Sequence, residues 1–87
     1  MFCVYVLRSK KDKSFYIGFA INLKERLAKH NDGLVYSTKH ILPMELLYCE
    51  AYKSKKDTLI REKRLKHFAK GFSSLKGRLK YSLMLQG

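Results

Sequence analysis

The sequence of 87 residues is 46% hydrophobic and 13% aromatic, enough apolar material for one domain with a modest core and too much for a disordered segment. Nineteen lysines and arginines against seven acidic residues give a net charge of +12, which favours a polyanionic partner, nucleic acid first and an anionic membrane surface second. No apolar run approaches the roughly 18 residues of a membrane span and no signal-peptide pattern is present, so we expect one cytoplasmic domain over residues 1–87.

Two short hydrophobic segments at the N-terminus predict a β-hairpin. Residues 2–8 alternate between two sets of apolar side chains, and a polar turn leads to a second strand at 14–19. If the numbers of paired residues sum to an odd value, Tyr5 lies opposite Tyr16 or Gly18, and both tyrosines share one face of the sheet. An even sum would place them on opposite faces. One alternating set is Phe2, Val4 and Val6, and the other is Cys3, Tyr5 and Leu7.

The next segment predicts a helix and a loop. Asn22 is a favourable N-cap, with Glu25 three residues later, for a helix at 23–31 that ends at the turn sequence NDG. Residues 33–43 form a loop that ends at Pro43. The chain therefore leaves the hairpin through a helix before it returns to the sheet.

The C-terminal half predicts one strand and two helices. Residues 44–52 form a largely buried strand, and Ser54 can cap a helix at 55–68. Gly71 breaks this helix, and residues 75–85 form a final helix with leucines at helical spacing. We therefore expect an α+β fold, a small three-stranded antiparallel sheet flanked by helices in the order ββαβαα.

Three polar side chains lie where helical periodicity predicts apolar ones. Arg26 and His30 share the edge of the apolar stripe of the first helix, where an arginine beside a partly buried histidine is the plainest explanation. Glu62 is the one carboxylate in an inward row with Thr58 and Leu65, although burial of an unpaired carboxylate is costly. Two explanations remain open: a structural salt bridge between Glu62 and Arg26, or a carboxylate that holds a divalent cation at a phosphate site.

These residues together suggest phosphodiester chemistry. Tyrosine is common in strands, so Tyr5 and Tyr16 alone carry little weight. Hydrolysis of a phosphodiester requires a base for water, a cation for the developing charge and a metal for the leaving oxygen. Two phenols on one face, with Arg26, His30 and Glu62 in a basic domain, supply groups of each kind.

The same residues give the sequence a resemblance to a known family. It resembles the GIY-YIG nuclease domain, in the small single-domain branch that is similar to the N-terminal part of the excinuclease C subunit. The matching segments are CVY at 3–5, YIG at 16–18, NLKERLAKHN at 22–31 and REKRLKHF at 61–68. Their order and spacing agree with the family, and the resemblance covers nearly the whole chain.

The resemblance implies a catalytic role for five residues. Tyr5 would help to activate the attacking water, Tyr16 would lie alongside the phosphate, and Arg26 would bind the scissile phosphate. Glu62 would hold a single Mg²⁺ or Mn²⁺ near the leaving oxygen. His30 would act as a second base or as a phosphate ligand.

The resemblance also bears on substrate binding. Gly18 would let the backbone approach the substrate closely. Tyr36 and Lys39, in the loop GLVYSTKH, are candidates for contact with the substrate, although both are equally consistent with ordinary surface residues. Cys3 replaces the glycine of the first motif. Cys3 and Cys49 lack metal-type spacing, and we expect free thiols.

We therefore predict a metal-dependent endonuclease that hydrolyses phosphodiester bonds in DNA, with preference for branched, flapped or damaged structures in repair or recombination. The alternative is a non-catalytic DNA- or RNA-binding module that keeps the nuclease fold. The complete set of five residues favours the enzyme, because a lone carboxylate such as Glu62 opposes phosphate binding unless a metal intervenes. A membrane-surface protein would need an amphipathic helix with a broad aromatic face, which the sequence lacks.

Nucleic acid is thus the expected partner, DNA more than RNA, with no membrane. Larger relatives use additional nucleic-acid-binding domains for specificity. We expect this chain to use its basic surface or a protein partner instead, and to be a monomer or a weak dimer.

Overall fold

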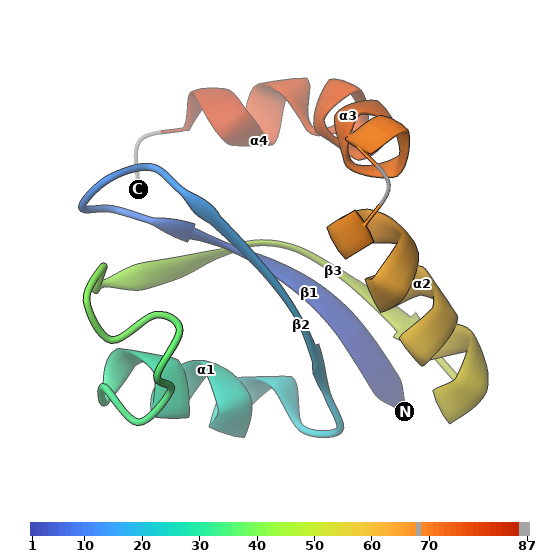
Figure 1. Cartoon of the computed structure of the whole chain (residues 1–87), viewed down its shortest axis with the longest axis horizontal. Helices are drawn as coiled ribbons and strands as arrows, with labels where there is room; N and C mark the ends of the chain where they lie inside the picture. Colours follow the sequence, from blue (N-terminus) through green and yellow to red (C-terminus); the bar gives the residue numbers. More distant parts are fainter. Residues whose placement is uncertain (68, 86–87) are drawn as a thin grey trace.

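The computed structural model describes residues 1–67 and 69–85. An antiparallel sheet in the order β2-β1-β3 is packed between α1 on one face and the other helices on the opposite face (Figure 1). This arrangement confirms the expected α+β fold. The elements are β1 (Phe2–Ser9), β2 (Phe15–Ala20), α1 (Leu23–Asn31), β3 (Met44–Tyr52), α2 (Lys55–His67), α3 (Ala69–Arg78) and α4 (Lys80–Met84).

The central strand β1 supplies side chains to both layers of the core. Val4 and Val6 are buried against α2 and α3, whereas Tyr5 and Leu7 are buried on the side of α1. The predicted alternation is therefore correct. It gives this small protein two apolar layers, and the candidate tyrosine Tyr5 belongs to the core of the α1 layer.

The register of the hairpin places both tyrosines on one face. Tyr5 pairs with Gly18 and Leu7 with Tyr16, so the paired numbers sum to 23. The odd register that was expected from the sequence is confirmed. Tyr16 then lies diagonally from Tyr5 across the hairpin.

Local hydrogen bonds explain where α1 begins and how it joins the sheet. The side chain of Asn22 accepts a bond from the backbone N–H of Glu25 at 3.1 Å, which is the predicted cap. At the other end, the amide of Asn31 donates to the carbonyl of Met44 and accepts from its N–H, at 3.0 and 2.8 Å. These two bonds attach the end of α1 to the start of β3. The intervening loop is present as predicted, and Pro43 follows a cis peptide bond.

Three expectations about the second half of the chain are wrong. The strand β3 has the predicted bounds but is half-exposed, with only Met44 fully buried, because it lies at an edge of the sheet. Gly71 does not end a helix. It lies inside α3, where a Cβ would meet the carbonyl oxygen of Arg64 at 3.3 Å, so glycine here allows α2 and α3 to approach each other.

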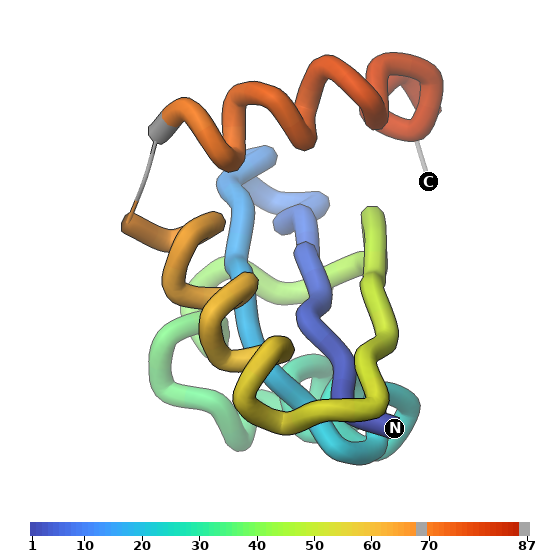
Figure 2. The backbone as a smooth tube through the Cα atoms, turned by 90° about the vertical axis from the view of Figure 1, so that its right-hand side faces the viewer, coloured from blue at the N-terminus to red at the C-terminus, as the bar shows by residue number. Residues whose placement is uncertain are grey.

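The third error concerns the last helix. Residues 75–85 do not form one helix, because the backbone at Leu79 (φ −101°, ψ 21°) departs from helical values between α3 and α4. In Figure 2 these two helices still run as one layer above the strands. The predicted helix at 55–68 is confirmed as α2 up to His67, and position 68 lies outside the described residues.

Candidate active site

The face of the hairpin that carries both tyrosines forms the floor of the candidate site. The Tyr5 and Tyr16 rings are 6.2 Å apart between centroids. Gly18 is buried opposite Tyr5, and a Cβ at this position would overlap the Tyr5 hydroxyl. Glycine is therefore required at position 18 by the phenol of Tyr5, a reason that differs from the close backbone approach to a substrate expected from the sequence.

The hydroxyl of Tyr5 is the centre of a hydrogen-bonded group. It lies 2.9 Å from Nε2 of His30 and accepts a bond from Nε of Arg26 at 3.3 Å. On the other side of the imidazole, Nδ1 lies 2.7 Å from the hydroxyl of Thr38. Arg26 can only donate, so Nε2 of His30 is the acceptor left for the proton of the buried phenol, and Nδ1 then donates to Thr38.

Thr38 was not identified from the sequence. The sequence indicates such a residue only indirectly, because a buried histidine needs a hydrogen-bond partner at each ring nitrogen. Which residue is that partner depends on how the loop folds. Both His30 and Thr38 are fully buried. His30 is therefore placed behind Tyr5 and has no free nitrogen with which to contact a phosphate.

Burial and the neighbouring cation set the protonation states of this group. Burial raises the pKa of Tyr5, although the hydrogen bond from Arg26 opposes the change. Burial, and then the positive charge of Arg26, lowers the pKa of His30. The phenol therefore carries its proton at neutral pH and faces an uncharged imidazole, which is a competent proton acceptor.

Glu62 approaches the site from α2, on the other face of the sheet. Its side chain is 18% exposed, and its carboxylate forms an ion pair with Lys66, one helical turn later, at 3.1 Å. Among residues 1–67 and 69–85, no ion pair joins Glu62 to Arg26, so the structural salt bridge considered above is absent. Burial is the main cause of the raised pKa of Tyr5, and the charge of Glu62 is the smallest of the causes that raise it.

The metal expected from the resemblance has one carboxylate ligand available. In the described part of the chain, no three His, Cys, Asp or Glu side chains come together as a metal-binding cluster. Mg²⁺ is nevertheless commonly held by one or two carboxylates together with water and substrate phosphate. Glu62 has one oxygen paired with Lys66 and is partly exposed. It therefore fits a metal bound mainly through the substrate.

The other two substrate-binding candidates lie together in the loop after α1. Tyr36 and Lys39 are exposed, and the Lys39 ammonium lies 4.7 Å from the centroid of the Tyr36 ring. They flank Thr38, whose hydroxyl reaches His30. The structure therefore brings these two residues next to the hydrogen-bonded group, although neither contacts it directly.

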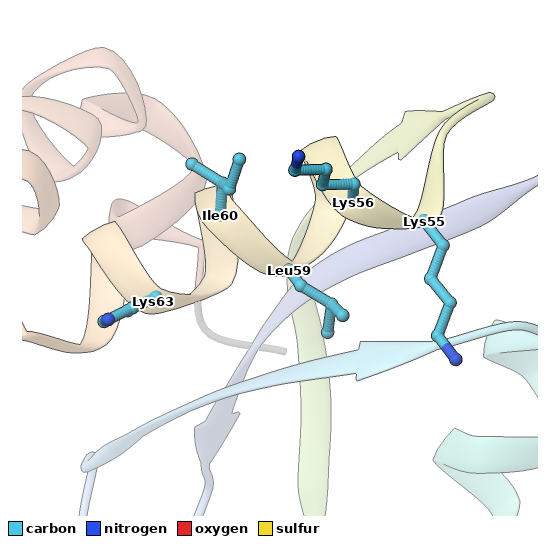
Figure 3. A pocket seen from close by; sticks show the side chains of 5 residues that line it. All are labelled: Lys55, Lys56, Leu59, Ile60 and Lys63. Carbon is cyan, nitrogen blue, oxygen red and sulfur yellow. The ribbon is translucent and has the colours of Figure 1, made fainter.

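Two open grooves lie on the surface, one beside Arg26 and one on α2. One, of about 360 Å³, runs beside Arg26 between the end of β2 and α1; it is lined by Phe19, Ala20, Ile21, Asn22, Glu25, Arg26 and Lys29. The other, of about 490 Å³, lies on α2 and is lined by Lys55, Lys56, Leu59, Ile60 and Lys63. In Figure 3, Lys55 and Leu59 extend toward β2, whereas Lys56 and Ile60 project away from the sheet. Both grooves combine apolar side chains with lysine or arginine, and the groove beside Arg26 also includes the carboxylate of Glu25.

A second polar cluster holds α2 against β3. The carboxylate of Glu50 accepts bonds from the hydroxyls of Tyr48 and Tyr52, at 2.7 and 2.5 Å, and two bonds from the guanidinium of Arg61, at 2.9 and 3.0 Å. Burial, with the bond to Glu50, raises the pKa of Tyr48 to about 12. The alternating sequence YCEAY, with Glu50 between two tyrosines on one strand face, is the signal from which this cluster could have been predicted.

Two phenols lie next to each other on the hairpin, with an arginine and a histidine on one helix and a glutamate on another. This combination of residues is the pattern of a nuclease domain. A family model described as the GIY-YIG catalytic domain matches residues 1–71, and the protein belongs to the GIY-YIG family. This membership supports a nuclease-type function.

The relatives are small proteins of one group. A UPF0213 protein of Staphylococcus saprophyticus is 35% identical over 68 residues, which cover 77% of this chain and 82% of that protein. A UPF0213 protein of Streptococcus pyogenes serotype M5 is 42% identical over 60 residues, 68% of this chain and 64% of that protein. The solution NMR structure of a UPF0213 protein from Bacillus halodurans is 27% identical, with a TM-score of 0.58 over 99% of this chain and 96% of that one. Within the described residues, no helix has the length and apolar character needed to cross a membrane.

Proposed function

We propose that the protein is a metal-dependent endonuclease that hydrolyses phosphodiester bonds in DNA. The observation that carries this proposal is the hydrogen-bonded group of Arg26, Tyr5 and His30 on one face of the hairpin, which α2 and its carboxylate Glu62 approach from the opposite face. A cation for phosphate, a phenol with an uncharged proton acceptor and a carboxylate for a metal are the groups that hydrolysis needs.

Arg26 is the phosphate ligand in this proposal. In the free protein its Nε donates to Tyr5, and the phenol is fully buried. A bond of 3.3 Å is long for a charge-assisted contact, so an incoming phosphate, with its full negative charge, is the stronger partner. Movement of the guanidinium onto the phosphate then exposes the Tyr5 hydroxyl to the cleft.

Tyr5 and His30 act as a proton relay. Water gives a proton to the phenol oxygen of Tyr5 while the phenol proton passes to Nε2 of His30, 2.9 Å away. The resulting hydroxide attacks phosphorus and the bond to the leaving oxygen breaks. Thr38 accepts the proton on Nδ1 of this imidazole in a hydrogen bond, and Nε2 is then the nitrogen that accepts from Tyr5. Tyr16 lies beside the phosphate and donates a hydrogen bond to it.

Glu62 would hold a single Mg²⁺ or Mn²⁺. Such an ion, when bound, supplies positive charge to the leaving oxygen. The cationic grooves beside Arg26 and on α2 are suited to phosphates on either side of the cleavage site. We propose branched, flapped or damaged DNA as the substrate and DNA repair or recombination as the process, with cytoplasmic location and a monomer or weak dimer as the working form.

One observation favours a second candidate function, a non-catalytic DNA- or RNA-binding module. Lys66 neutralises Glu62 in the free protein, so the carboxylate does not by itself oppose phosphate binding. In the enzyme the charge of Glu62 is needed to hold the metal, whereas in a binding module no metal has to be held. The substitution Glu62→Gln separates them, because it keeps the shape of the side chain and removes the charge that attracts a metal.

We expect Glu62→Gln to lower the cleavage rate by orders of magnitude in Mg²⁺ or Mn²⁺. Its affinity for the same DNA without metal should be unchanged or higher. The melting temperature should stay near that of the wild type, because an i,i+4 ion pair on a helix contributes only about 0.3–0.5 kcal/mol. Cleavage is measured on labelled duplex, flap, fork, four-way junction, single strand and RNA. Glu45→Gln is the matched control: it removes one carboxylate charge from an exposed pair with Lys10 and should change nothing.

Two results would reject the enzyme. If the wild type cleaves none of these substrates with either metal but binds them, the protein is a binding module. If Glu62→Gln cleaves as well as the wild type, the metal role of Glu62 is rejected.

A further inference from the structure

The loop after α1 carries a large aromatic side chain in an exposed position. Tyr36 is 79% exposed, while its neighbours Val35 and Thr38 are buried. A tight turn produces this arrangement, because the N–H groups of Thr38 and Lys39 both donate to the carbonyl of Val35, at 3.1 and 3.0 Å. The phenol ring therefore points outward from a turn whose other side is part of the core.

This turn is attached to the protein on three sides. The hydroxyl of Thr38 lies 2.7 Å from Nδ1 of His30, and the hydroxyl of Ser9 donates to the carbonyl of Ile41 at 2.7 Å. Lys11 in the hairpin turn donates to the carbonyl of His40 at 3.1 Å. An exposed ring on an anchored turn is pre-organised for a ligand, because little freedom is lost on binding.

The groups around the ring indicate the chemistry of that ligand. The ammonium of Lys39 lies 4.7 Å from the ring centroid, over one face, and the imidazole of His40 meets the ring edge-on with centroids 6.3 Å apart. An aromatic face with an adjoining ammonium is the arrangement that binds unpaired nucleotides, with the base stacked on the ring and the phosphate near the cation.

We propose that Tyr36 is a stacking site for an unpaired base of the nucleic acid strand whose phosphate is bound at Arg26. This inference rests on the proposed function and gives it a substrate class: single-stranded or flapped nucleic acid. In a continuous duplex both faces of each base are covered by neighbouring base pairs, so no face is available to a side chain. Tyr36 is two residues from Thr38, at most about 7 Å between Cα atoms, and the Thr38 hydroxyl contacts the imidazole of His30, so the stacking site belongs to the loop that supports the hydrogen-bonded group.

The test measures binding without divalent metal, so it does not depend on cleavage. The base analogue 2-aminopurine, whose fluorescence falls on stacking, is placed at successive positions of a single-stranded oligonucleotide. The wild type should quench the probe most strongly at one position. Tyr36→Ala should remove that maximum and weaken single-strand binding by about 5- to 150-fold, the range for loss of one stacked base, with duplex affinity unchanged.

Two variants serve as controls. Tyr36→Phe keeps the ring face and should behave as the wild type. Tyr81→Ala removes another tyrosine, 76% exposed and with the Lys80 ammonium 5.8 Å from its ring centroid, from α4 in the opposite layer. It should leave both the quenching and the affinity unchanged.

The stacking site is overturned if Tyr36→Ala keeps the quenching maximum and the single-strand affinity, or if it weakens single-strand and duplex binding equally. Failure of the proposed catalysis looks different: Tyr36→Ala then shows its selective loss, but cleavage is absent or independent of Glu62. Cleavage that needs Glu62, with no selective loss in Tyr36→Ala, rejects the stacking site alone.

Discussion

At position 18 the phenol of Tyr5 occupies the space that a Cβ would need. Gly18→Ala would place a methyl group on the Tyr5 hydroxyl and 3.0 Å from the ring of Tyr16. Since both rings pack in the core, we expect a loss of about 1–3 kcal/mol in the free energy of unfolding and loss of cleavage, because the phenol is pushed away from His30. Denaturant unfolding and cleavage of a labelled substrate measure the two effects.

A glycine in another environment provides the control. Gly77 lies in α3, and a methyl group added there would have no atom within 4 Å, so Gly77→Ala should be neutral or stabilise the protein by up to about 1 kcal/mol. If Gly18→Ala unfolds at the same denaturant concentration as the wild type and cleaves normally, neither stability nor cleavage depends on the position of the Tyr5 phenol.

The residues of the candidate site differ in how far the sequence predicts them. Helical spacing placed Arg26 and His30 beside the apolar stripe, and hairpin parity placed Tyr5 and Tyr16 on one face, because both depend on neighbours close along the chain. Thr38 could not be predicted in this way, since its contact with His30 depends on the conformation of a loop. That contact changes the role of His30, which is a buried proton acceptor in our proposal and no longer a phosphate ligand.

At the scale of elements, the position of Glu62 depends on how α2 is rotated about its axis. The preceding residue, Arg61, is held by both oxygens of Glu50 on β3. Consecutive helical residues are about 100° apart, so the attachment of Arg61 to β3 also fixes the direction in which the next side chain, Glu62, leaves α2. The cluster around Glu50 is thus a positioning device for the carboxylate.

We expect Glu50→Gln to lower stability by about 1–3 kcal/mol, because the half-buried guanidinium of Arg61 loses its charged partner and the two tyrosine hydroxyls lose the charged oxygens to which they donate. Cleavage under conditions where the variant is folded should fall more than DNA binding, since rotation of α2 displaces Glu62 but leaves Arg26 in place. Glu45→Gln, in an exposed pair with Lys10 at 3.8 Å, should cost at most about 1 kcal/mol. Equal losses of cleavage and binding in Glu50→Gln would argue against a positioning role.

The helices and strands also differ in how far their positions could be predicted from the sequence. The start of α1 was predictable because Asn22 caps it locally, and the bounds of β3 followed from its composition. The exposure of β3 was not, because strand order depends on contacts far apart in the chain. Gly71 was assigned to a helix end for the same reason: its use, the close approach of α3 to Arg64, involves a neighbouring helix that the local sequence does not identify.

Across the whole molecule, positive charge remains largely without internal partners. Among the described residues, three ion pairs satisfy one lysine or arginine each, at Lys10, Arg61 and Lys66. With the residues that the structure describes, the three lysines around the α2 groove form no such pair. A surface of this kind binds phosphates through release of counterions, so the affinity depends strongly on salt.

The distribution of these charges leads to a prediction about salt dependence. We expect log K for duplex DNA to fall with log salt by about 0.9 per phosphate neutralised, and replacement of Lys55, Lys56 and Lys63 by glutamine to reduce this slope by as much as about 2.7. The control replaces Lys70, Arg78 and Lys80, three exposed cations of the α3–α4 layer, and lowers the net charge by the same amount. If the DNA runs along the cleft beside α2, the control should keep most of the wild-type slope, because its charges lie away from the bound phosphates. Equal slopes for both triple variants would mean that DNA binding responds to net charge and that the DNA does not follow the α2 groove. A wild-type affinity that hardly changes with salt would indicate that a protein partner, not the basic surface, brings this domain to its substrate.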